Sequence, residues 1–445
     1  MKMRAIVLAA GKGTRMKSAT TKVLHDLCGR AMLWFVIDAL REAGVDDIVV
    51  VTNPQVQERI EEFGVRGIVQ QEQLGTGHAV RIALEELPVD ASGRILIAYG
   101  DMPLAHAGIF REVVGALDGR GVALALVTAR MPLPSNFGRI VRNGALVERI
   151  VEMRDADDAE LAIDEMNAGI YAYAEPELRD AAARLRNENA QKEYYLTDTV
   201  ADFVKAGRGV VPVVAADHRP LLGINDRVEL ATARKAMNIR LCEKYMRDGA
   251  TIVDPDTTYL EPELRIGNDT VIYPNTSIGR LSELGERCVI GPNARLSNTK
   301  LGDACVVRES VVLDCAFGNG VHVGPFAHLR NGAVLDKGVQ IGNFVEVKKS
   351  HLAAGVKANH LAYIGDAEVG ERSNIGAGTI TANYDGQKKN PTTIGADVSV
   401  GSNTTLIAPV SVGDGALVGG GSVVTKDVPA GARVAGNPAK PLQKT

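Results

Sequence analysis

The sequence predicts two parts of different fold class: an α/β domain with a Rossmann-like, mostly parallel sheet, then an all-β domain in which hexapeptide repeats form a left-handed parallel β-helix. The first prediction rests on short apolar segments that alternate with amphipathic helical segments over residues 1–227. The second rests on an aliphatic residue followed by glycine, which recurs at six-residue spacing after residue 250. Aromatic residues make up only 4% of the chain and glycines number 47, which favours a core of small aliphatic side chains in part of it.

Strands and helices alternate in the first 227 residues. Short apolar runs predict buried strands, whereas apolar residues spaced three and four apart predict helices that cover them. In chain order we expect a strand at 5–9, a helix at 32–43 closed by Gly44, a strand at 47–52, a helix at 77–86 and a strand at 94–99. This order is typical of a doubly wound sheet, in which ligands bind at the carboxyl edge of the strands.

A single long helix is expected between the two parts. Residues 228–248 contain neither proline nor glycine and are rich in residues that favour a helix. Gly249 then ends this helix. We therefore predict an α/β domain at 1–227, a linker helix at 228–248 and a β-helix domain at 249–445.

Aliphatic–glycine pairs mark the repeats of the C-terminal region. They include Ile278-Gly279, Leu284-Gly285, Ile290-Gly291, Val323-Gly324, Ile341-Gly342, Val369-Gly370, Ile375-Gly376, Ile394-Gly395, Val400-Gly401, Val412-Gly413 and Val418-Gly419. Each aliphatic side chain would point into a narrow interior, and three hexapeptides would make one triangular coil. With strands about 4.8 Å apart, about ten coils give a prism on the order of 48 Å long. A β-sandwich is the alternative, but it would not keep a six-residue register over so many repeats.

The six-residue register is interrupted between residues 342 and 364 and again between 379 and 393. Insertions into a repeat protein usually form loops that carry function. We therefore expect loops in these two segments. Together the segments contain His351, His360, Tyr363, Asn383, Tyr384, Lys388 and Lys389.

Charge and cysteine content exclude several classes of protein. The net charge is −4 and no long basic run occurs, which argues against binding to nucleic acid or to a membrane surface. No apolar stretch approaches the length of a membrane span, and the apolar start is too short for a signal peptide. The five cysteines form no C-x-x-C pair, so we expect no disulfide framework, no zinc site and a cytoplasmic location.

A glycine-rich loop, Leu8-Ala-Ala-Gly-Lys-Gly-Thr-Arg-Met16, follows the first expected strand. Gly11 and Gly13 let backbone N–H groups approach a phosphate, and Arg15 adds positive charge. The loop lacks the G-K-[ST] ending of a Walker A motif, and Met16 stands where a dinucleotide-binding loop has its third glycine. Taken alone, such a turn is as compatible with a structural role as with phosphate binding.

Further motifs follow this loop in a characteristic order. They are Lys22-Val-Leu, Gln73-Leu-Gly-Thr-Gly-His-Ala79, Tyr99-Gly-Asp-Met-Pro103, Phe137-Gly-Arg-Ile, Ile150-Val-Glu, Asn167-Ala-Gly-Ile, Glu193-Tyr-Tyr-Leu-Thr-Asp and Gly223-Ile-Asn-Asp. The set resembles the sugar-1-phosphate nucleotidylyltransferases. Together with the repeats, almost the whole chain resembles the bacterial bifunctional N-acetylglucosamine-1-phosphate uridylyltransferase/glucosamine-1-phosphate acetyltransferase family.

For the N-terminal domain, this resemblance implies attack of N-acetylglucosamine 1-phosphate on the α-phosphorus of UTP, with release of pyrophosphate. Such a reaction depends on alignment and charge neutralisation more than on acid–base catalysis. By resemblance, Asp101 and Asn225 hold Mg²⁺ through oxygen atoms, and Arg15 and Lys22 are catalytic cations that neutralise the triphosphate. The resemblance implies that uracil is selected by Gln70, Gln73, Gly75 and Thr76. It implies that the sugar is held by Gly138, Glu152 and Asn167. The remaining residues expected to contact the substrates are Leu8, Ala9, Ala10, Gly11, Tyr99 and Gly100. We interpret His78 as a helix-start or packing residue rather than a base.

The resemblance also implies an acetyltransferase in the repeat region. His360 would remove a proton from the amine of glucosamine 1-phosphate, which would then attack the thioester of acetyl-CoA, a role that suits an imidazole. By resemblance, Arg330, Lys348 and Lys389 bind the sugar phosphate, Tyr363 and Asn374 line the sugar pocket, and Ala377, Asn383, Tyr384, Ser402 and Gly420 contact coenzyme A. Family members form trimers that build this site between neighbouring subunits, so we expect a homotrimer.

The chain departs from the family pattern at three places. Thr21 precedes Lys22 and Asn331 follows Arg330, where the family usually has proline. Both changes affect loop stiffness rather than charge. The segment Val434-Ala-Gly-Asn-Pro-Ala-Lys-Pro-Leu442 is typical of hexapeptide acetyltransferases in general, whereas many family members end with an arginine near coenzyme A.

Three alternative functions are open at this point. A nucleotidylyltransferase for another sugar or nucleotide could use the β-helix only for oligomerisation, although His360, Tyr363, Asn374 and Lys389 favour acetyl transfer. A γ-type carbonic anhydrase half would need three convergent histidines, and the histidines here fall outside the expected register. A non-catalytic exchange-factor subunit would tend to lose the glycine-rich loop or Asp101, and both are present.

Overall fold

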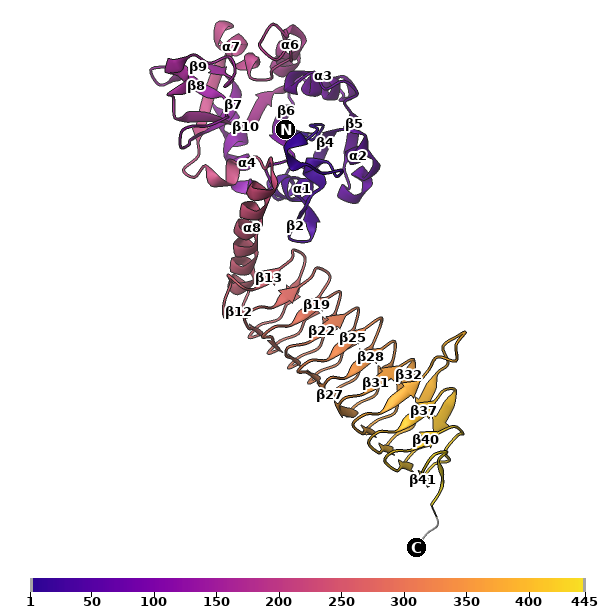
Figure 1. Ribbon diagram of the computed structural model, residues 1–445. Coiled ribbons are helices and arrows are strands. Elements are labelled where there is room, and N and C mark those ends of the chain that lie inside the picture. The colour runs from indigo at the N-terminus through magenta and orange to yellow at the C-terminus, as the bar shows by residue number, and fades with distance from the viewer. Residues whose placement is uncertain (1–2, 443–445) are drawn as a thin grey trace. The chain divides into compact units, whose positions relative to one another are not determined.

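The structure, a computed structural model, describes residues 3–442 (Figure 1). It divides into two compact units, Met1–Ala236 and Met237–Thr445. The division falls within helix α8 (Arg227–Arg247), which lies within one residue of the helix expected at 228–248. Among the described residues, no helix is long and apolar enough to cross a membrane.

A nine-stranded sheet lies at the centre of the N-terminal unit, with the order β11-β7-β10-β6-β1-β4-β5 and a β8–β9 hairpin beside β10. Its strands are β1 (Met3–Leu8), β4 (Asp47–Thr52), β5 (Arg66–Val69), β6 (Arg94–Tyr99), β7 (Val122–Arg130), β8 (Arg139–Asn143), β9 (Leu146–Val151), β10 (Glu165–Ala174) and β11 (Gly209–Val214), with a separate pair β2 (Asp26–Leu27) and β3 (Arg30–Ala31). The β1, β4, β5 and β6 strands pair in parallel, as do β7 and β11, which confirms the mostly parallel sheet. The β10 strand is antiparallel to β6 and β7. The sequence did not indicate that β10 is antiparallel, because a strand that is buried on both faces is a continuous apolar run whichever way it points.

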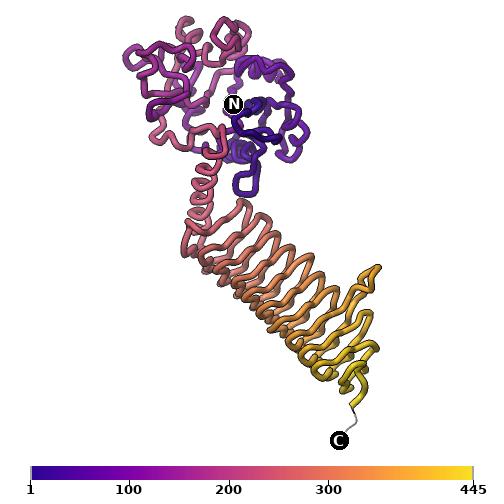
Figure 2. The backbone as a smooth tube through the Cα atoms, in the orientation of Figure 1, coloured from indigo at the N-terminus to yellow at the C-terminus, as the bar shows by residue number. Residues whose placement is uncertain are grey.

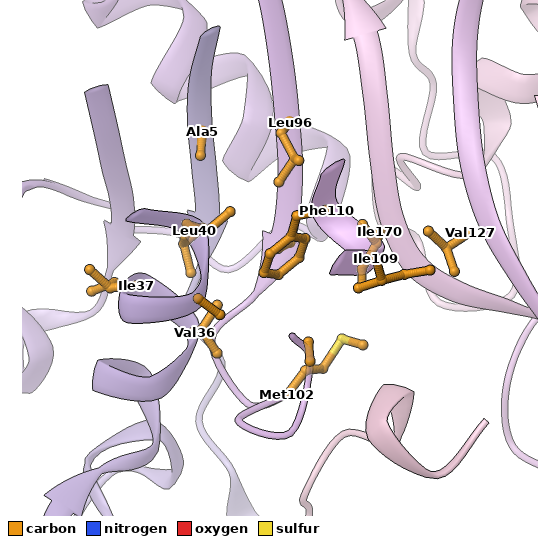
Figure 3. Packing of buried hydrophobic residues seen from close by; sticks show 14 of the residues in the cluster. Ala5, Val36, Ile37, Leu40, Leu96, Met102, Ile109, Phe110, Val127 and Ile170 are labelled. Atoms are coloured by element: carbon orange, nitrogen blue, oxygen red, sulfur yellow. The ribbon is translucent and has the colours of Figure 1, made fainter. Parts of the chain in front are cut away.

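Helices cover both faces of this sheet (Figure 1). One face packs α1 (Met32–Glu42), α2 (Pro54–Glu58) and α4 (Ala107–Gly115), and the other packs α3 (Thr76–Glu86), α6 (Glu175–Arg184) and α7 (Asp198–Lys205); α5 (Asp158–Leu161) is a single turn. Alternate residues of β1 point to opposite faces, so Ala5 packs with Ile37 and Phe110 on the first face (Figure 3), whereas Ile6 packs with Val80 on the second. All five side chains are at most 1% exposed. The two cores fix the carboxyl ends of the central strands, where the site lies.

The C-terminal unit is a parallel β-helix of the hexapeptide-repeat type, and its successive coils are visible in Figure 2. Short strands stack in three sheets, and each coil adds one strand to each sheet. The 12-stranded sheet contains β12 (Thr251–Ile252), β15 (Val271–Ile272), β18 (Val289–Ile290), β21 (Val306–Val307), β24 (His322–Val323), β27 (Gln340–Asn343), β30 (Lys357–His360), β33 (Asn374–Ile375), β36 (Ser399–Val400), β39 (Leu417–Val418), β41 (Arg433–Ala435) and β42 (Lys440–Pro441). The 10-stranded sheet contains β13 (Tyr259–Leu260), β16 (Ser277–Ile278), β19 (Arg295–Ser297), β22 (Val311–Leu313), β25 (His328–Arg330), β28 (Glu346–Lys348), β31 (Tyr363–Gly365), β34 (Ile380–Ala382), β37 (Thr405–Ile407) and β40 (Val423–Val424). The 9-stranded sheet contains β14 (Arg265–Ile266), β17 (Glu283–Leu284), β20 (Lys300–Leu301), β23 (Ala316–Phe317), β26 (Val334–Leu335), β29 (His351–Leu352), β32 (Ala367–Val369), β35 (Thr392–Ile394) and β38 (Val410–Val412).

Interior and corner positions of the coil have different requirements. Interior aliphatic residues stack along the sheet, as Ile290 and Val307 do, and both are fully buried. Corner residues adopt the left-handed conformation, which asparagine tolerates well, and Asn275 and Asn293 have φ of +58° and +53°. The repeat seen in the sequence is therefore the alternation of these two environments.

Of the two loops expected in the repeats, only the second forms. The prediction of a loop between residues 342 and 364 is wrong, because β28, β29 and β30 continue the coil and bury Val347, Leu352 and Ala358. The pattern was hidden because alanine fills an interior position at 358 and no glycine follows it. Residues 383–391 do form a loop between β34 and β35, where Tyr384 pairs with Lys389, and this loop projects from the coils (Figure 2).

Candidate active sites

A cleft of about 340 Å³ opens at the carboxyl ends of β1 and β6. These strands are paired in register, with Leu8 opposite Tyr99, so the loops that follow them lie side by side. The cleft is lined by Leu8, Ala9, Ala10, Gly11, Lys22, Val23, Gln70, Gln73, Gly75, Thr76, Ala79, Tyr99, Asp101 and Glu193. Val23, Ala79 and Glu193 were not expected there. The first two carry no polar group that could have marked them, and Glu193 stands in a recognised motif to which no role was attached.

The glycine-rich loop is packed tightly against the segment that carries Lys22. Gly13 has φ of +60°, and a Cβ atom built on it would lie 2.6 Å from the Lys22 Cβ. Glycine is therefore required by both conformation and space. The loop continues into the 3-10 turn η1 (Thr14–Met16), and Lys22 begins the turn η2 (Lys22–Leu24). This packing brings Arg15 and Lys22 to one place.

Two cationic side chains meet two side-chain oxygens, from a carboxylate and an amide, beside the cleft. The Lys22 ammonium contacts the Asp101 carboxylate and lies 3.1 Å from Asn225 Oδ1. Arg15 donates to the same Oδ1 atom at 2.8 Å. The Asn225 amide is oriented by its Nδ2, which donates to the Gly223 carbonyl at 3.0 Å. Asp101 and Asn225 therefore direct their oxygens to the point where the Lys22 ammonium lies.

The donor set formed by Asp101 and Asn225 fits Mg²⁺. Among residues 3–442, no cluster of three or more His, Cys, Asp and Glu residues could hold a metal by itself. Mg²⁺ usually takes only one or two protein ligands and completes its octahedral shell with water and substrate phosphates. One carboxylate and one amide oxygen beside two cations suited to phosphate therefore match the type and number of protein ligands that Mg²⁺ takes.

Two glutamine amides are anchored by backbone carbonyls in another part of the cleft lining. Gln73 Nε2 donates to the Ala10 carbonyl at 2.7 Å, and Gln70 Nε2 donates to the Gly75 carbonyl at 3.2 Å. Gly75 has φ of +102°, and a Cβ atom on it would lie 2.7 Å from the Tyr194 carbonyl oxygen. The close approach of the 193–194 segment thus requires a glycine immediately before α3.

Three residues expected to bind the sugar lie together, although they do not line the cleft itself. The Asn167 N–H donates to the Gly138 carbonyl at 2.8 Å, and Asn167 Nδ2 donates to the Tyr171 hydroxyl at 2.6 Å. Glu152 accepts a hydrogen bond from Thr197 Oγ1 at 3.0 Å. Burial raises the pKa of Glu152 against the opposing effect of the Thr197 hydrogen bond.

Gly100, which was expected to contact the substrates, is instead packed beneath the site. It follows Tyr99 and does not line the cleft. A Cβ atom on Gly100 would lie 3.1 Å from Leu33 and 3.2 Å from Ala9. Its small size therefore lets the two loops approach each other.

In the β-helix, His360 is oriented by an asparagine on the neighbouring coil. The strands β27 and β30 pair in register, with Asn343 opposite His360. Asn343 Oδ1 lies 2.8 Å from His360 Nδ1 and accepts a hydrogen bond from the Nδ1–H group, so the lone pair of the imidazole is on Nε2. This second residue was not expected from the sequence, although it stands in the segment after Gly342.

The three expected phosphate-binding cations, here named the cationic cluster, are Arg330, Lys348 and Lys389. Arg330 and Lys348 lie opposite each other on neighbouring coils, and Arg330 is held by two contacts of 2.9 and 2.6 Å to Glu346 Oε1. Lys389 comes from the projecting loop and lies beside Lys348. Its proximity lowers the pKa of Lys348, and Arg330 adds to the effect. The cluster is therefore a place of crowded positive charge.

The projecting loop is tied to the same sheet face. Asn383 Nδ2 donates to Asp366 Oδ2 at 2.6 Å and lies 3.4 Å from the Tyr363 hydroxyl. Tyr363 lies on β31, opposite Glu346 on β28, the residue that holds Arg330. His360 lies on the 12-stranded sheet, across the corner at Leu361 from this group. A single chain thus presents His360 and the cationic cluster on two adjoining faces.

Ala377, Ser402 and Gly420, three of the five residues expected to contact coenzyme A, follow one column of successive coils. The Asn403 N–H donates to the Ala377 carbonyl at 2.6 Å, and the Gly421 N–H donates to the Ser402 carbonyl at 2.7 Å. Gly420 lies beside Ser402 in the next coil. The other two lie outside this column: Tyr384 is 61% exposed on the projecting loop, and Asn383 anchors that loop. Asn374, which was expected to line the sugar pocket, is exposed on β33.

The fold and its two groups of polar residues define a class of transferase with a nucleotidyltransferase domain followed by a hexapeptide-repeat domain. Residues 5–199 match the MobA-like NTP transferase domain, residues 391–426 match the bacterial transferase hexapeptide (six repeats), and residues 283–315 match the hexapeptide repeat of succinyl-transferase.

Relatives that span nearly the whole chain identify the family. The chain is 46% identical to the Bifunctional protein GlmU of Trichlorobacter lovleyi, over 96% of this chain and 94% of that protein. It is 45% identical to that of an Exiguobacterium species, over 96% of each, and 44% identical to that of Streptomyces avermitilis, over 96% and 90%. The chain belongs to the GlmU family of bifunctional proteins.

Proposed function

We propose that the protein makes UDP-N-acetylglucosamine from glucosamine 1-phosphate in two steps. The β-helix domain transfers an acetyl group from acetyl-CoA to glucosamine 1-phosphate, and the N-terminal domain then transfers a uridylyl group from UTP to N-acetylglucosamine 1-phosphate. The observation that carries the proposal is the meeting of Arg15, Lys22, Asp101 and Asn225 beside a cleft at the carboxyl edge of the sheet. Both steps would take place in the cytoplasm, which suits five free thiols.

In the uridylyl step, the residues of the cleft bind the triphosphate of UTP and the phosphate of N-acetylglucosamine 1-phosphate and align them. Arg15 and Lys22 supply positive charge to the triphosphate, which lowers the repulsion met by the attacking sugar phosphate. Asp101 and Asn225 would hold Mg²⁺, which, when bound, neutralises charge on the phosphate oxygens. A sugar phosphate oxygen forms a bond to the α-phosphorus of UTP, and the bond to the departing pyrophosphate breaks. Glu152 and Asn167 offer hydrogen-bonding groups to the sugar.

In the acetyl step, His360 acts as the general base. Since its Nδ1 donates to Asn343, Nε2 accepts a proton from the amine while the amine nitrogen bonds to the thioester carbonyl carbon. The carbon–sulfur bond then breaks, and coenzyme A leaves as the thiol after it takes up a proton. The cationic cluster binds the sugar phosphate, because a phosphate relieves the repulsion that lowers the pKa of Lys348.

We also propose a homotrimer that contacts along the β-helix. Phe326, Phe344 and Leu361 occupy successive positions at one corner and are 56%, 56% and 60% exposed; we name them the apolar ladder. All three have positive φ, which is costly for large side chains, and the two phenyl rings stack at 5.5 Å. Exposed, strained apolar residues favour an interface, and Leu361 is next to His360. A neighbouring subunit on this corner would complete the acetyl site.

A split assay tests both halves of the proposal. One arm supplies UTP, N-acetylglucosamine 1-phosphate and Mg²⁺ and follows pyrophosphate, and the other supplies acetyl-CoA and glucosamine 1-phosphate and follows free thiol. Asp101→Ala should abolish only the first activity, and His360→Ala only the second, with losses of at least about 100-fold. The exposed residues Asp180 and His322 provide matched controls, whose alanine variants should keep both activities. A wild-type protein without thiol release, or without pyrophosphate release, would contradict the corresponding half.

A further inference from the structure

The Gln70 side chain has a fixed orientation that leaves one acceptor without a partner. It is 5% exposed and lines the cleft. Its Nε2 lies 3.2 Å from the Gly75 carbonyl oxygen, and because a carbonyl can only accept, the amide nitrogen must face that side. Within residues 3–442, no donor reaches Gln70 Oε1. The printed side-chain contacts of Gln70 are both made by Nε2, and an acceptor without a protein partner in the wall of a cleft points to a ligand that donates to it.

His78 provides the second acceptor that keeps this orientation. Its Nδ1 lies 3.1 Å from Gln70 Nε2, so the imidazole accepts at Nδ1 and carries its proton on Nε2. The residue stands in the first turn of α3, and its ring lies against Tyr194 with the centroids 6.2 Å apart. The backbone of Tyr194 is itself held on both sides, by Leu74 and by Gly77. The position of the imidazole is therefore set by packing that does not involve Gln70.

Both amide hydrogens of Gln70 thus have acceptors in the protein, and the amide oxygen is left for the ligand. The N3 position of uracil carries a hydrogen and can donate to that oxygen, whereas N3 of cytosine is an acceptor and would be repelled. Discrimination of this kind can be large, because the wrong base leaves buried polar groups unpaired. If the amide turned over, its NH₂ group would face the base and the preference would be reversed.

We propose that His78 is a positioning residue for nucleotide selection, which holds the Gln70 amide with its oxygen toward the base and so favours uracil over cytosine. The inference rests on the proposed uridylyltransferase function of the N-terminal domain. It assigns a specific role to a residue that the sequence suggested only as a helix-start or packing residue. Loss of the Nδ1 acceptor removes one of the two contacts that prevent rotation of the amide.

The test compares UTP with CTP in two variants of His78. His78→Phe keeps an aromatic ring beside Tyr194 but has no acceptor, and His78→Asn keeps an acceptor near the position of Nδ1. With the full-length protein, N-acetylglucosamine 1-phosphate and Mg²⁺, we measure kcat and KM for each nucleotide from pyrophosphate release. His78→Phe should raise the KM for UTP about 10-fold, change kcat by less than about 2-fold, and lower the UTP/CTP ratio of kcat/KM at least about 10-fold. His78→Asn should keep most of the ratio, and Glu85→Gln, on the exposed side of α3, should change nothing.

A second set of variants keeps the test decisive if His78→Phe folds poorly. Gln70→Leu removes the amide and should lower the UTP/CTP ratio to a similar extent. The double variant with His78→Leu, which also lacks the Nδ1 acceptor, should then match Gln70→Leu alone, because the histidine acts only through the glutamine. An unchanged ratio in His78→Phe, or an additive loss in the double variant, overturns the inference. A wild-type protein that uses no UTP would instead refute the proposed function, so the two failures are distinguishable.

Discussion

Replacing Lys22 with methionine should strengthen metal binding to the nucleotide-free protein. In the free protein the Lys22 ammonium contacts Asp101 and lies 3.1 Å from Asn225 Oδ1, where the two oxygen donors converge. A divalent ion that binds these oxygens must displace the ammonium. Lys22→Met keeps the length of the side chain but removes its charge, so the oxygens become free for the metal.

The size of the effect follows from the geometry. The Lys22 and Asp101 side chains are 14% and 16% exposed, so an effective dielectric constant of about 20 is appropriate. A divalent ion about 4 Å from an immobile ammonium would be repelled by ~8 kcal/mol. Because Lys22 can swing away, the observed cost is mainly the lost contact with Asp101, about 1.5–3 kcal/mol. We therefore expect metal affinity to rise about 10- to 100-fold in the variant.

Titration of Mn²⁺ followed by electron paramagnetic resonance, with no nucleotide present, measures this affinity directly. Lys12→Met, at an exposed position of the glycine-rich loop, should leave it unchanged, and Asp101→Ala should abolish it. With UTP present the sign should reverse, because Lys22→Met then lacks a cation for the triphosphate. Equal or weaker Mn²⁺ binding to nucleotide-free Lys22→Met would refute the reasoning.

Two further predictions concern the β-helix. Burial tends to lower the pKa of His351, but its contacts of 3.0 Å to Asp336 and 3.1 Å to Glu368 outweigh this and raise the pKa above its usual 6.5. The ion pairs of protonated His351 with these two carboxylates therefore stabilise the fold fully below pH 6.5, and this stabilisation is lost as the pH rises through the higher pKa of the folded state. Because the His351 side chain is 42% exposed, the free energy of unfolding should change by less than about 1 kcal/mol. Urea unfolding of His351→Asn should not show this pH dependence. Phe344→Ser should weaken the proposed trimer by roughly 2 kcal/mol per contact in sedimentation experiments, whereas Tyr259→Ser, at an equally exposed position, should leave it intact. Equal association of Phe344→Ser and the unmodified protein would exclude the apolar ladder as the interface.

Local patterns were sufficient for most elements and for the class of protein. The helix expected at 32–43 is α1 (Met32–Glu42), and the strand expected at 47–52 is β4 (Asp47–Thr52). Both were predicted because the spacing of apolar residues within each segment matches the element that it forms. The repeat failed as a guide only where alanine replaced a larger aliphatic residue, at Ala358. The coil continued there because a small side chain still fits its narrow interior.

Candidate site residues were recognised where a motif contains them, and their contacts were missed where the partner comes from another part of the chain. Asn343 lies a coil away from His360, and its contact depends on the pairing of β27 with β30. Glu193 lines the cleft because its segment packs against Gly75. No pattern in the neighbouring residues reports such a contact.

The sequence by itself determined the two-domain organisation, the β-helix and the family of transferases, because periodicity and ordered motifs are properties of the chain alone. Only the tertiary structure decided that the Lys22 ammonium lies on Asp101 and Asn225, and that His78 holds the Gln70 amide. Periodicity shows which face of an element is buried. Which distant side chain meets that face depends on strand order and register, and these are set by the packing of the whole domain.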